Sequence, residues 1–534
     1  MKKLNLHVLL LFMILSGTMF AQSDAATDIN KIIRKHGMEQ SKVAEISSMI
    51  CDVHGPRLSG SQGLADARKW AESTLKEWGM ANVKQEAWGP FGRGWELKHF
   101  EMHASSPQYW QVIAYPKAWS PSTKGLVSGE VIYIEATEEA DLEKYKGKLK
   151  GKFVLFDPKR ETKEWFESSA SRYDADRLLK LANEGAPVPR PRRNWNNLGG
   201  MTFNKVLWKF LYDEQPLAVL DRGSKGDLGT VFVSGARVSN EDNVRAYDEQ
   251  AMIVPQATLA VEHYNRLMRL LEKGVTPKIS MEIKAEYQSP AKGMEYNVLA
   301  EIPGTDLKDE VVMFGAHFDS WHTGTGATDN GAGSSVMMEA ARILLETIKE
   351  SGIQPRRTLR LALWTGEEQG LYGSANYVRE HLAETEPGGW IPKALKPEHE
   401  KISAYYNLDN GTGKIRGIYA QGNQAVVPIF RPWLDEFKDL DAATISLANT
   451  GGTDHLPFDG VGIPGFQFIQ EPIAYFNSTH HSNMDNWDHL IEADLKQAAT
   501  IIASFVWNTS QRDEKLPRKA LEIENQASSQ GSNK

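Results

Sequence analysis

From residue 295 onward, the sequence alternates between short apolar runs and longer stretches with helical periodicity. The apolar runs have the length and composition of strands that are buried on both faces. This order of strands and helices favours a three-layer α/β/α sandwich around a mostly parallel mixed sheet. The expected strands are 296–302, 311–316, 358–365, 403–408, 415–420 and 463–469, and the expected helices are 331–350, 370–383, 426–438 and 489–508.

The whole chain has 534 residues, which is more than one domain usually holds. Helical periodicity is present in 28–51 and 61–79. Short strand-like runs separated by turn residues fill 122–285, which predicts a β-rich accessory domain. Within it, 187–211 is rich in Pro, Arg and Trp and is predicted to be a long surface loop. The polar residues from 511 to the end have no core-forming pattern and are predicted to be disordered.

The N-terminus has the features of a signal peptide. Two lysines precede the apolar run 8–15, and small residues follow it, with Ala21 as the expected cleavage site. The run is shorter than the ~20 residues that span a bilayer. We therefore expect residues 1–21 to be removed and the protein to be secreted or periplasmic, with an uncleaved anchor or a buried helix as the alternatives.

Composition argues against several classes of protein. The net charge is −8 and no basic block stands out, so a nucleic-acid partner is not expected. No stretch beyond the N-terminus is apolar enough for stable membrane insertion. Cys51 is the only cysteine, so an internal disulfide and a cysteine zinc site are excluded, and a buried side chain is favoured over a catalytic thiol.

Potential metal ligands follow the expected strands in order. In a sheet of this kind, sites form where strands end and loops begin, so side chains at successive strand ends should converge. Taken alone, each residue is more often a surface acid or a core histidine; the joint occurrence favours a metal site. The residues are His317 and Asp319 after 311–316, Asp329 in the glycine-rich loop that follows, Glu367 and Glu368 after 358–365, Asp409 after 403–408, and His480 and His481 after 463–469.

The ligand types indicate zinc, because imidazole and carboxylate are good zinc ligands whereas sets of oxygen atoms alone suit calcium or magnesium. Two histidines with three or more carboxylates are too many for one tetrahedral ion. They suit two ions about 3.5–4 Å apart that share a bridging carboxylate. The glycines would let the loop backbone pass close to the metals and place Asp329 between them. Other hydrolase patterns fail: His399-Glu400 lacks the second histidine of HExxH, and Ser59 stands where GxSxG needs its first glycine.

Ordered motifs resemble those of the co-catalytic di-zinc exopeptidases, a family that includes bacterial aminopeptidases, carboxypeptidase Q and glutamate carboxypeptidase. They are GAHFDSW with GATDNGAG, LWTGEEQGLYGS, YYNLDNGTG and HHSNMD. The forms HxDSW, LWTxEEQG and HHS are most similar to carboxypeptidase Q-type members. The resemblance covers about 295–510 and extends to GPRLSGSQGLADARKW at 55–70.

The resemblance implies a domain layout. Residues 22–121 would be the N-terminal part of the peptidase domain and 286–510 its zinc-binding part. Between them, 122–285 is similar to the protease-associated domain that many members carry as an insertion. Residues 1–21 would be the signal peptide, and 511–534 the disordered tail.

The resemblance also implies a role for each residue. His317 and Asp409 would bind one zinc, Glu368 and His481 the other, and Asp329 would bridge the two. Asp319 would orient the imidazole of His317. Glu367 would be the general base. His480, which stands where relatives often have Tyr, would stabilise the oxyanion, with a structural role behind the ligands as the alternative. An Asp454-His455 pair is similar to one near the substrate pocket of relatives, with a loop-stabilising role as the alternative.

The implied activity is that of a secreted exopeptidase, which hydrolyses a terminal peptide bond or a dipeptide through a hydroxide bridged by two zinc ions. A receptor-like relative without catalysis and a single-zinc aminoacyl cyclase are the alternatives. Whether the enzyme acts at the amino or the carboxyl end stays open; Arg416 and Glu471 are in nearby loops and are of the types that bind a terminal charge. The oligomeric state also stays open, with a homodimer as one option.

Overall fold

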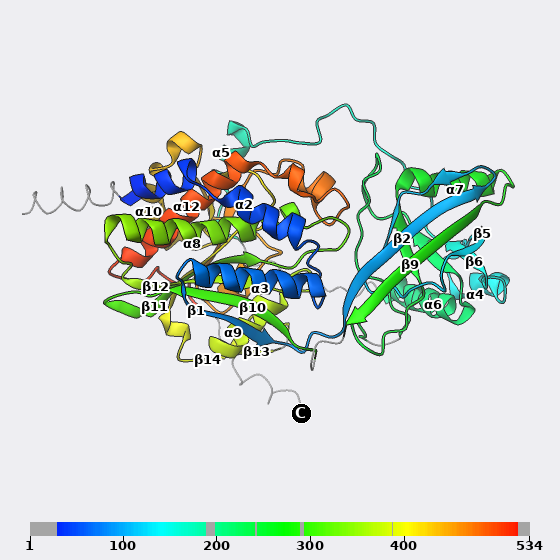
Figure 1. Cartoon of the computed structure of the whole chain (residues 1–534), viewed down its shortest axis with the longest axis horizontal. Helices are drawn as coiled ribbons and strands as arrows, with labels where there is room; N and C mark the ends of the chain where they lie inside the picture. The colour runs from blue at the N-terminus through cyan, green and yellow to red at the C-terminus, as the bar shows by residue number, and fades with distance from the viewer. Residues whose placement is uncertain (1–28, 188–197, 241–242, 289–292, 387, 522–534) are drawn as a thin grey trace, which may run out of the picture.

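The computed structural model describes residues 29–187, 198–240, 243–288, 293–386 and 388–521, so the expected signal peptide lies outside the described residues. The chain forms two units, each built on one eight-stranded sheet (Figure 1). The first unit holds the expected α/β region, and the second is formed by a middle part of the chain. No helix in these ranges combines the length and the apolar character needed to cross a membrane.

The sheet of the first unit is mixed, and its centre is parallel. The three neighbours β12, β11 and β15 run parallel, as do β15 and β18, whereas β1 with β10, β10 with β12, and β18 with β16 pair antiparallel. In spatial order the strands are β1 (Ala81–Trp88), β10 (Glu295–Ile302), β12 (Arg357–Trp364), β11 (Leu307–His317), β15 (Ile402–Asn407), β18 (Gly465–Gln470), β16 (Ile415–Tyr419) and β17 (Thr444–Ser446).

Helices cover both faces of this sheet, which confirms the predicted three-layer sandwich. Successive side chains of a strand point to opposite faces. Val312 and Phe314 of β11 accordingly pack in one core cluster, and Val311 and Met313 pack in another. The first face is covered by α2 (Val43–Ser48), α3 (Gln62–Glu77), α8 (Ala332–Ser351), α10 (Val427–Asp435) and α12 (Glu492–Gln511), and the second by α9 (Tyr372–His381) and α11 (His455–Gly460). A small hairpin, β13 (Ala383–Thr385) with β14 (Pro392–Leu395), follows α9.

Helix α3 shows how local sequence sets an element. The hydroxyl of Ser61 caps its first turn by accepting a hydrogen bond from the backbone N–H of Leu64. Leu64, Ala67, Ala71 and Leu75 recur at helical spacing and are buried. The helix therefore presents one apolar stripe to the core.

The second unit contains the predicted β-rich segment, but its sheet begins earlier than residue 122. The long strands β2 (Gly94–Ser106) and β9 (Lys278–Gln288) pair antiparallel along most of their length (Figure 1). Pairing with β9 draws β2 into the second sheet. The other strands are β3 (Trp110–Gln111), β4 (Ala114–Pro116), β5 (Val127–Tyr133), β6 (Lys152–Leu155), β7 (Ala218–Asp221) and β8 (Gln256–Leu259), with helices α4 (Glu139–Leu142), α5 (Ala175–Asn183), α6 (Leu198–Glu214) and α7 (Val261–Glu272).

Two sequence predictions are wrong. The predicted surface loop 187–211 contains the start of helix α6, whose Leu207, Trp208 and Leu211 are buried against β6 and β7. The predicted disordered tail is also ordered as far as residue 521, because Leu516 is buried and Arg518 donates hydrogen bonds to the carbonyl oxygens of His399 and Ile402. In both segments, packing against distant parts of the chain stabilises a structure that the local sequence pattern does not predict.

Segments of the two units are hydrogen-bonded to each other beside the expected site. The backbone N–H of Val233 donates to the carbonyl oxygen of His481, and Asn483 N–H donates to the carbonyl oxygen of Val231. Further along, Ser171 N–H donates to the carbonyl oxygen of Ile473. The histidine-bearing turn of the first unit is thus held by the second unit.

Candidate functional site

The eight predicted site residues converge at the edge of the first sheet where its parallel strands end. His317 is the last residue of β11. Glu367 and Glu368 follow β12, and Asp409 follows β15. His480 and His481 come after β18, in the turn attached to the second unit. Parallel strands end at one edge, so residues far apart in the chain meet there.

One group consists of His317, Asp409 and Asp329. The Nε2 atom of His317 lies 3.3 Å from Oδ1 of Asp329 and 3.4 Å from Oδ1 of Asp409. Two ligands that each lie about 2.0–2.1 Å from one tetrahedral zinc ion are separated by ~3.3–3.4 Å. The observed spacing therefore fits ligands that share an ion.

A second group lies on the other side of Asp329. The Nε2 atom of His481 is 2.9 Å from Oε2 of Glu368 and 3.1 Å from Oδ2 of Asp329. The two carboxylate oxygens of Asp329 thus face the two different histidines. This is the arrangement that a bridging carboxylate requires.

Four donor atoms of the two groups are buried without hydrogen-bond partners. They are Nε2 of His317, Oδ2 of Asp329, Oε1 of Glu368 and Oδ1 of Asp409. A buried polar group without a partner is costly unless an ion or a water molecule satisfies it. Nitrogen and carboxylate oxygen donors at this spacing suit zinc.

The charge around these groups favours a bound cation. Burial opposes the charged form of both histidines, yet Asp409 and Glu367 raise the pKa of His317 well above its ordinary value. Glu368 and Asp329 likewise raise the pKa of His481 to about 11. The surrounding carboxylates thus stabilise positive charge strongly enough to outweigh burial.

Asp319 has a different set of contacts from the one implied by the resemblance. The Nδ1–H of His317 donates to the backbone carbonyl oxygen of Asp319 at 3.1 Å, whereas the carboxylate lies 3.7 Å from Nδ1. That carboxylate accepts hydrogen bonds from the backbone N–H groups of Glu367 and Glu368, at 3.2 and 3.3 Å, and from the hydroxyl of Ser59 at 2.9 Å. Asp319 therefore fixes the glutamate pair as well as the histidine.

Glu367 lies next to the first group. Its Oε2 is 4.0 Å from Nε2 of His317, farther than the oxygens of Asp329 and Asp409. Burial, with repulsion from Asp409 and Asp454, raises the pKa of Glu367 well above its ordinary value, although His317 opposes this shift. A raised pKa makes the carboxylate a stronger proton acceptor.

His480 stacks on His481, with ring centroids 3.7 Å apart, and its Nε2 lies 3.8 Å from Oδ2 of Asp329. Burial lowers the pKa of His480 to about 4, although Asp329 acts in the opposite direction. The imidazole is therefore neutral at pH 7 and available for hydrogen bonding. It is close enough to the second group to be a further donor there.

The loop that carries Asp329 is held from two sides. Asp485 accepts hydrogen bonds from the N–H groups of Thr328 and Asp329, at 2.6 and 3.2 Å. The conformation of the same loop also depends on Gly326. Its φ is +66°, and a Cβ atom there would lie 2.2 Å from the side chain of Ser320. Only glycine fits this position, which explains one glycine of the loop.

Arg57 is a site-supporting residue that sequence reasoning missed. Its fully buried guanidinium donates to the carbonyl oxygens of Phe318, Thr325 and Gly326, at 2.7, 2.8 and 2.9 Å. These bonds hold both ends of the glycine-rich loop. Arg57 lies in GPRLSG at 55–60, a segment to which the family resemblance extends, and this was a signal for it. No spacing pattern, however, shows which carbonyl groups an arginine side chain will reach.

Two other pairs of residues have mainly structural contacts. Arg416 lies 2.5 Å from the buried carboxylate of Glu471, so these residues neutralise each other and neither is free to bind a terminal charge. His455 is buried beside Gln421, and burial lowers its pKa to about 4. Asp454 accepts a hydrogen bond from Ser374 at 2.5 Å. Its charge raises the pKa of Glu367, so Asp454 affects the site electrostatically.

Comparison with known proteins shows which family this part of the chain matches. The model of Peptidase family M28 matches residues 297–506, the span that supplies every residue of the two groups. Residues 297–506 are an M28 peptidase domain. The match confirms the resemblance to the co-catalytic zinc exopeptidases.

The similarity extends beyond the M28 domain. Carboxypeptidase Q of Bos taurus is 26% identical over 493 residues, which cover 90% of this chain and 88% of that protein. Carboxypeptidase Q of Homo sapiens is 24% identical with the same coverage. The family match and these relatives support the predicted enzyme class, a metallo-exopeptidase.

Solved structures share the fold. A peptidase M28 precursor from Shewanella amazonensis has a TM-score of 0.65 at 22% identity, covering 93% of this chain and 99% of that one. BSAP, a zinc aminopeptidase from Bacillus subtilis, has a TM-score of 0.54 at 18% identity, covering 88% and 95%. Both alignments span the second unit as well as the M28 domain.

Proposed function

We propose that this protein is an exported exopeptidase that holds two zinc ions and removes a terminal residue from short peptides or splits dipeptides. The observation that carries the proposal is the pair of ligand groups on either side of Asp329, in which four buried donor atoms lack hydrogen-bond partners. We assign His317 and Asp409 to one ion, Glu368 and His481 to the other, and Asp329 to both. When bound, zinc supplies a Lewis acid that polarises a carbonyl group and makes a water molecule acidic at neutral pH.

Glu367 is the general base in this proposal. Its carboxylate takes a proton from the attacking water and later delivers that proton to the nitrogen of the leaving amine. Asp319 holds the backbone of Glu367 and Glu368, so that one carboxylate faces the ligands and the other the reacting water. The neutral His480 is placed to donate a hydrogen bond to the oxyanion of the tetrahedral intermediate.

Two further features belong to the proposal. We assign residues 1–21 as a signal peptide, which would make the protein secreted or periplasmic. We assign the second unit as a protease-associated domain, because it is inserted between parts of the first unit and adjoins the histidine-bearing turn.

Zinc content and a Glu367→Gln variant test the function together. We expect about two zinc ions per chain by elemental analysis. We also expect Glu367→Gln to lower kcat for dipeptides by roughly 10²–10⁴-fold, because general-base catalysis contributes about that much. The zinc content of the variant should equal that of the wild type. Glu384→Gln, a change at an exposed position on β13, is the matched control and should retain full activity.

The other outcomes discriminate between the alternatives. About one zinc per chain would favour the aminoacyl cyclase, and none would favour a receptor-like protein without catalysis. Loss of zinc in Glu367→Gln would show that Glu367 is a ligand and that the roles of the glutamate pair are reversed.

A further inference from the structure

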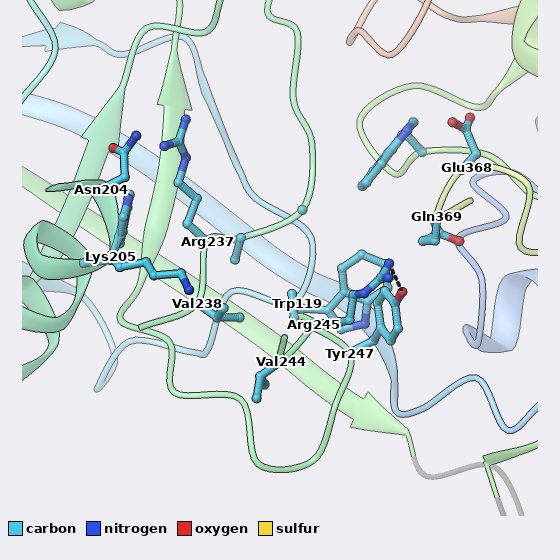
Figure 2. A pocket seen from close by; sticks show the side chains of 15 residues that line it. Trp119, Asn204, Lys205, Arg237, Val238, Val244, Arg245, Tyr247, Glu368 and Gln369 are labelled. Atoms are coloured by element: carbon cyan, nitrogen blue, oxygen red, sulfur yellow. Dashed lines mark hydrogen bonds between the residues drawn. The ribbon is translucent and has the colours of Figure 1, made fainter. Parts of the chain in front are cut away.

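The second unit forms part of two cavities that adjoin the ligand groups. Their volumes are about 430 and 460 Å³, and both are lined by Arg237. One cavity lies beside Glu368 and Gln369 and is lined on its far side by Asn204, Lys205 and Arg237 (Figure 2). The other is lined by His480 and His481 together with residues of β7 and the loop that follows it. A substrate held at the ligand groups would therefore contact the second unit.

Both cavities are more basic than the rest of this acidic chain. Four basic side chains and two acidic ones line the cavity beside the histidines: Lys117, Arg222, Lys225 and Arg237, with Asp157 and Asp221. Lys117 and Asp221 form an ion pair at 2.9 Å. The cavity beside Glu368 has three basic lining residues, and its only acidic one is Glu368 itself. Basic surroundings of this kind attract a carboxylate and repel an ammonium group.

Lys225 lies close to the ligand groups. Its ammonium group donates to the carbonyl oxygen of Phe476 at 2.6 Å, in the segment that leads into His480. It also lies 4.2 Å from the centre of the Phe232 ring, within the range of a cation–π contact. One hydrogen bond leaves two of the three N–H donors of the ammonium group. Among the described residues, no carboxylate forms an ion pair with Lys225.

Arg237 lines the same cavity as Lys225, beside His480 and His481. Its side chain is exposed, and its guanidinium lies 5.8 Å from the centre of the Trp208 ring. Within the described ranges, it too has no ion-pair partner. A planar guanidinium with free donors is well suited to a carboxylate.

The backbone fixes both residues relative to His481. Lys225 and Arg237 flank residues 231–233, which are hydrogen-bonded to residues 481–483. The bond from Val233 N–H to the carbonyl oxygen of His481 is 3.1 Å long. The basic side chains are thus positioned by the same contact that holds the histidine ligand.

We propose that Lys225, with Arg237, forms a subsite for the free C-terminal carboxylate of a short peptide substrate. The inference rests on the proposed peptidase function and assigns the end of the peptide at which it acts. A peptide with its scissile carbonyl group at the ligand groups would extend its C-terminal residue toward the second unit. The amino group of the substrate would not be required.

The test compares a dipeptide with its C-terminal amide and with its N-acetyl form, using zinc-loaded protein. We expect the wild type to cleave the free acid and its N-acetyl form with a higher kcat/KM than the amide. Lys225→Met should lower kcat/KM for the free acid by about 10- to 100-fold, the range for a hydrogen bond to a charged group, and leave the amide nearly unchanged. Arg237→Gln should act in the same direction, and Lys225→Arg should restore part of the loss.

Lys273→Met is the matched control, since Lys273 is exposed at the end of α7 in the same unit. It should behave as the wild type. Equal cleavage of acid and amide by the wild type would overturn the inference, as would an equal loss on both substrates in Lys225→Met. Absence of hydrolysis of any of these peptides by the zinc-loaded wild type would instead overturn the proposed function.

Discussion

The carboxylate of Asp319 is fully buried and accepts hydrogen bonds from Ser59 and from the N–H groups of two consecutive glutamates. A carboxylate offers only acceptors, and all three neighbours are donors. Glu367 and Glu368 stand at the start of a turn, in which Gly370 N–H donates to the carbonyl oxygen of Glu367, so fixing both N–H groups helps to fix the directions of both side chains. Asp319 is therefore a positioning residue for Glu367, the proposed base, and for Glu368, the proposed ligand.

Replacement of Asp319 by Asn should separate this role from simple packing. The amide has nearly the same shape, but its NH₂ group would face a backbone N–H. We expect kcat to fall and zinc to bind more weakly, each by about 10- to 100-fold, as is typical for residues that orient metal ligands. The measurements are steady-state kinetics at saturating zinc and competition with a chelator. Asp66→Asn, at a half-exposed side chain of α3, is the control, and unchanged kcat in Asp319→Asn would refute the role.

Sequence reasoning named the residues that converge at the site and one support, Asp319, but it missed Arg57 and Lys225. His317, Asp329 and Asp409 could be predicted because each stands at the end of a strongly apolar strand or in a glycine-rich loop. Arg57 and Lys225 could not, because each acts on backbone carbonyl groups or cavities formed by distant segments. Such contacts follow from tertiary packing, which leaves no periodic signal in the sequence.

Among the elements, a buried ion pair links the ends of β4 and β7, which lie on either side of β8 in the second sheet. Lys117 follows β4, and Asp221 is the last residue of β7; their charged atoms are 2.9 Å apart. Burial works against ionisation of Asp221, but the ammonium group of Lys117 holds its pKa below the ordinary value. A carboxylate with a lowered pKa stabilises the fold above the unfolded pKa, and this contribution is lost as the pH falls through the folded pKa.

Asp221→Asn should therefore destabilise the protein in a pH-dependent way. At pH 7 the variant leaves Lys117 charged and buried without a partner, which costs about 3–5 kcal/mol. The difference in unfolding free energy between wild type and variant should stay constant down to about pH 4 and shrink below it, because Asp221 of the wild type then becomes protonated. Denaturant unfolding across this pH range measures the difference.

Asp213→Asn provides the comparison, since Asp213 pairs with Lys209 on the exposed side of α6. An exposed pair of this kind contributes about 0–1 kcal/mol. A similar effect of the two substitutions at pH 7 would contradict the role assigned to the buried pair.

At this scale, most strands and helices of the first unit could be predicted, because strands such as β11 and β12 are apolar on both faces. The strands of the second sheet were harder to predict from the sequence. Its strand β2 has half-exposed and charged positions, and it joins the sheet through pairing with β9, which lies far away in the sequence. Strand pairing between such distant segments is set by the whole fold and cannot be read from a local pattern.

For the whole molecule, the C-terminal segment packs against both layers of the first unit, and Leu516 joins the core of the first face. Leu516 is buried, and Lys519 lies 2.7 Å from the carboxylate of Asp459 in α11. A chain shortened to end at residue 511 should lose about 1.5–3 kcal/mol of unfolding free energy from the burial of Leu516 alone. A chain that ends at residue 521 keeps these contacts and should match the full-length protein in denaturant unfolding. Equal stability of the two shortened chains would contradict this.

The hydrogen bonds between 231–233 and 481–483 have a consequence for biogenesis. During synthesis, the strands of the second sheet through β9 leave the ribosome before most of the first sheet is made. A completed second unit can therefore act as a template on which the late histidine turn docks. The chain would gain its ability to retain metal only after both units have assembled.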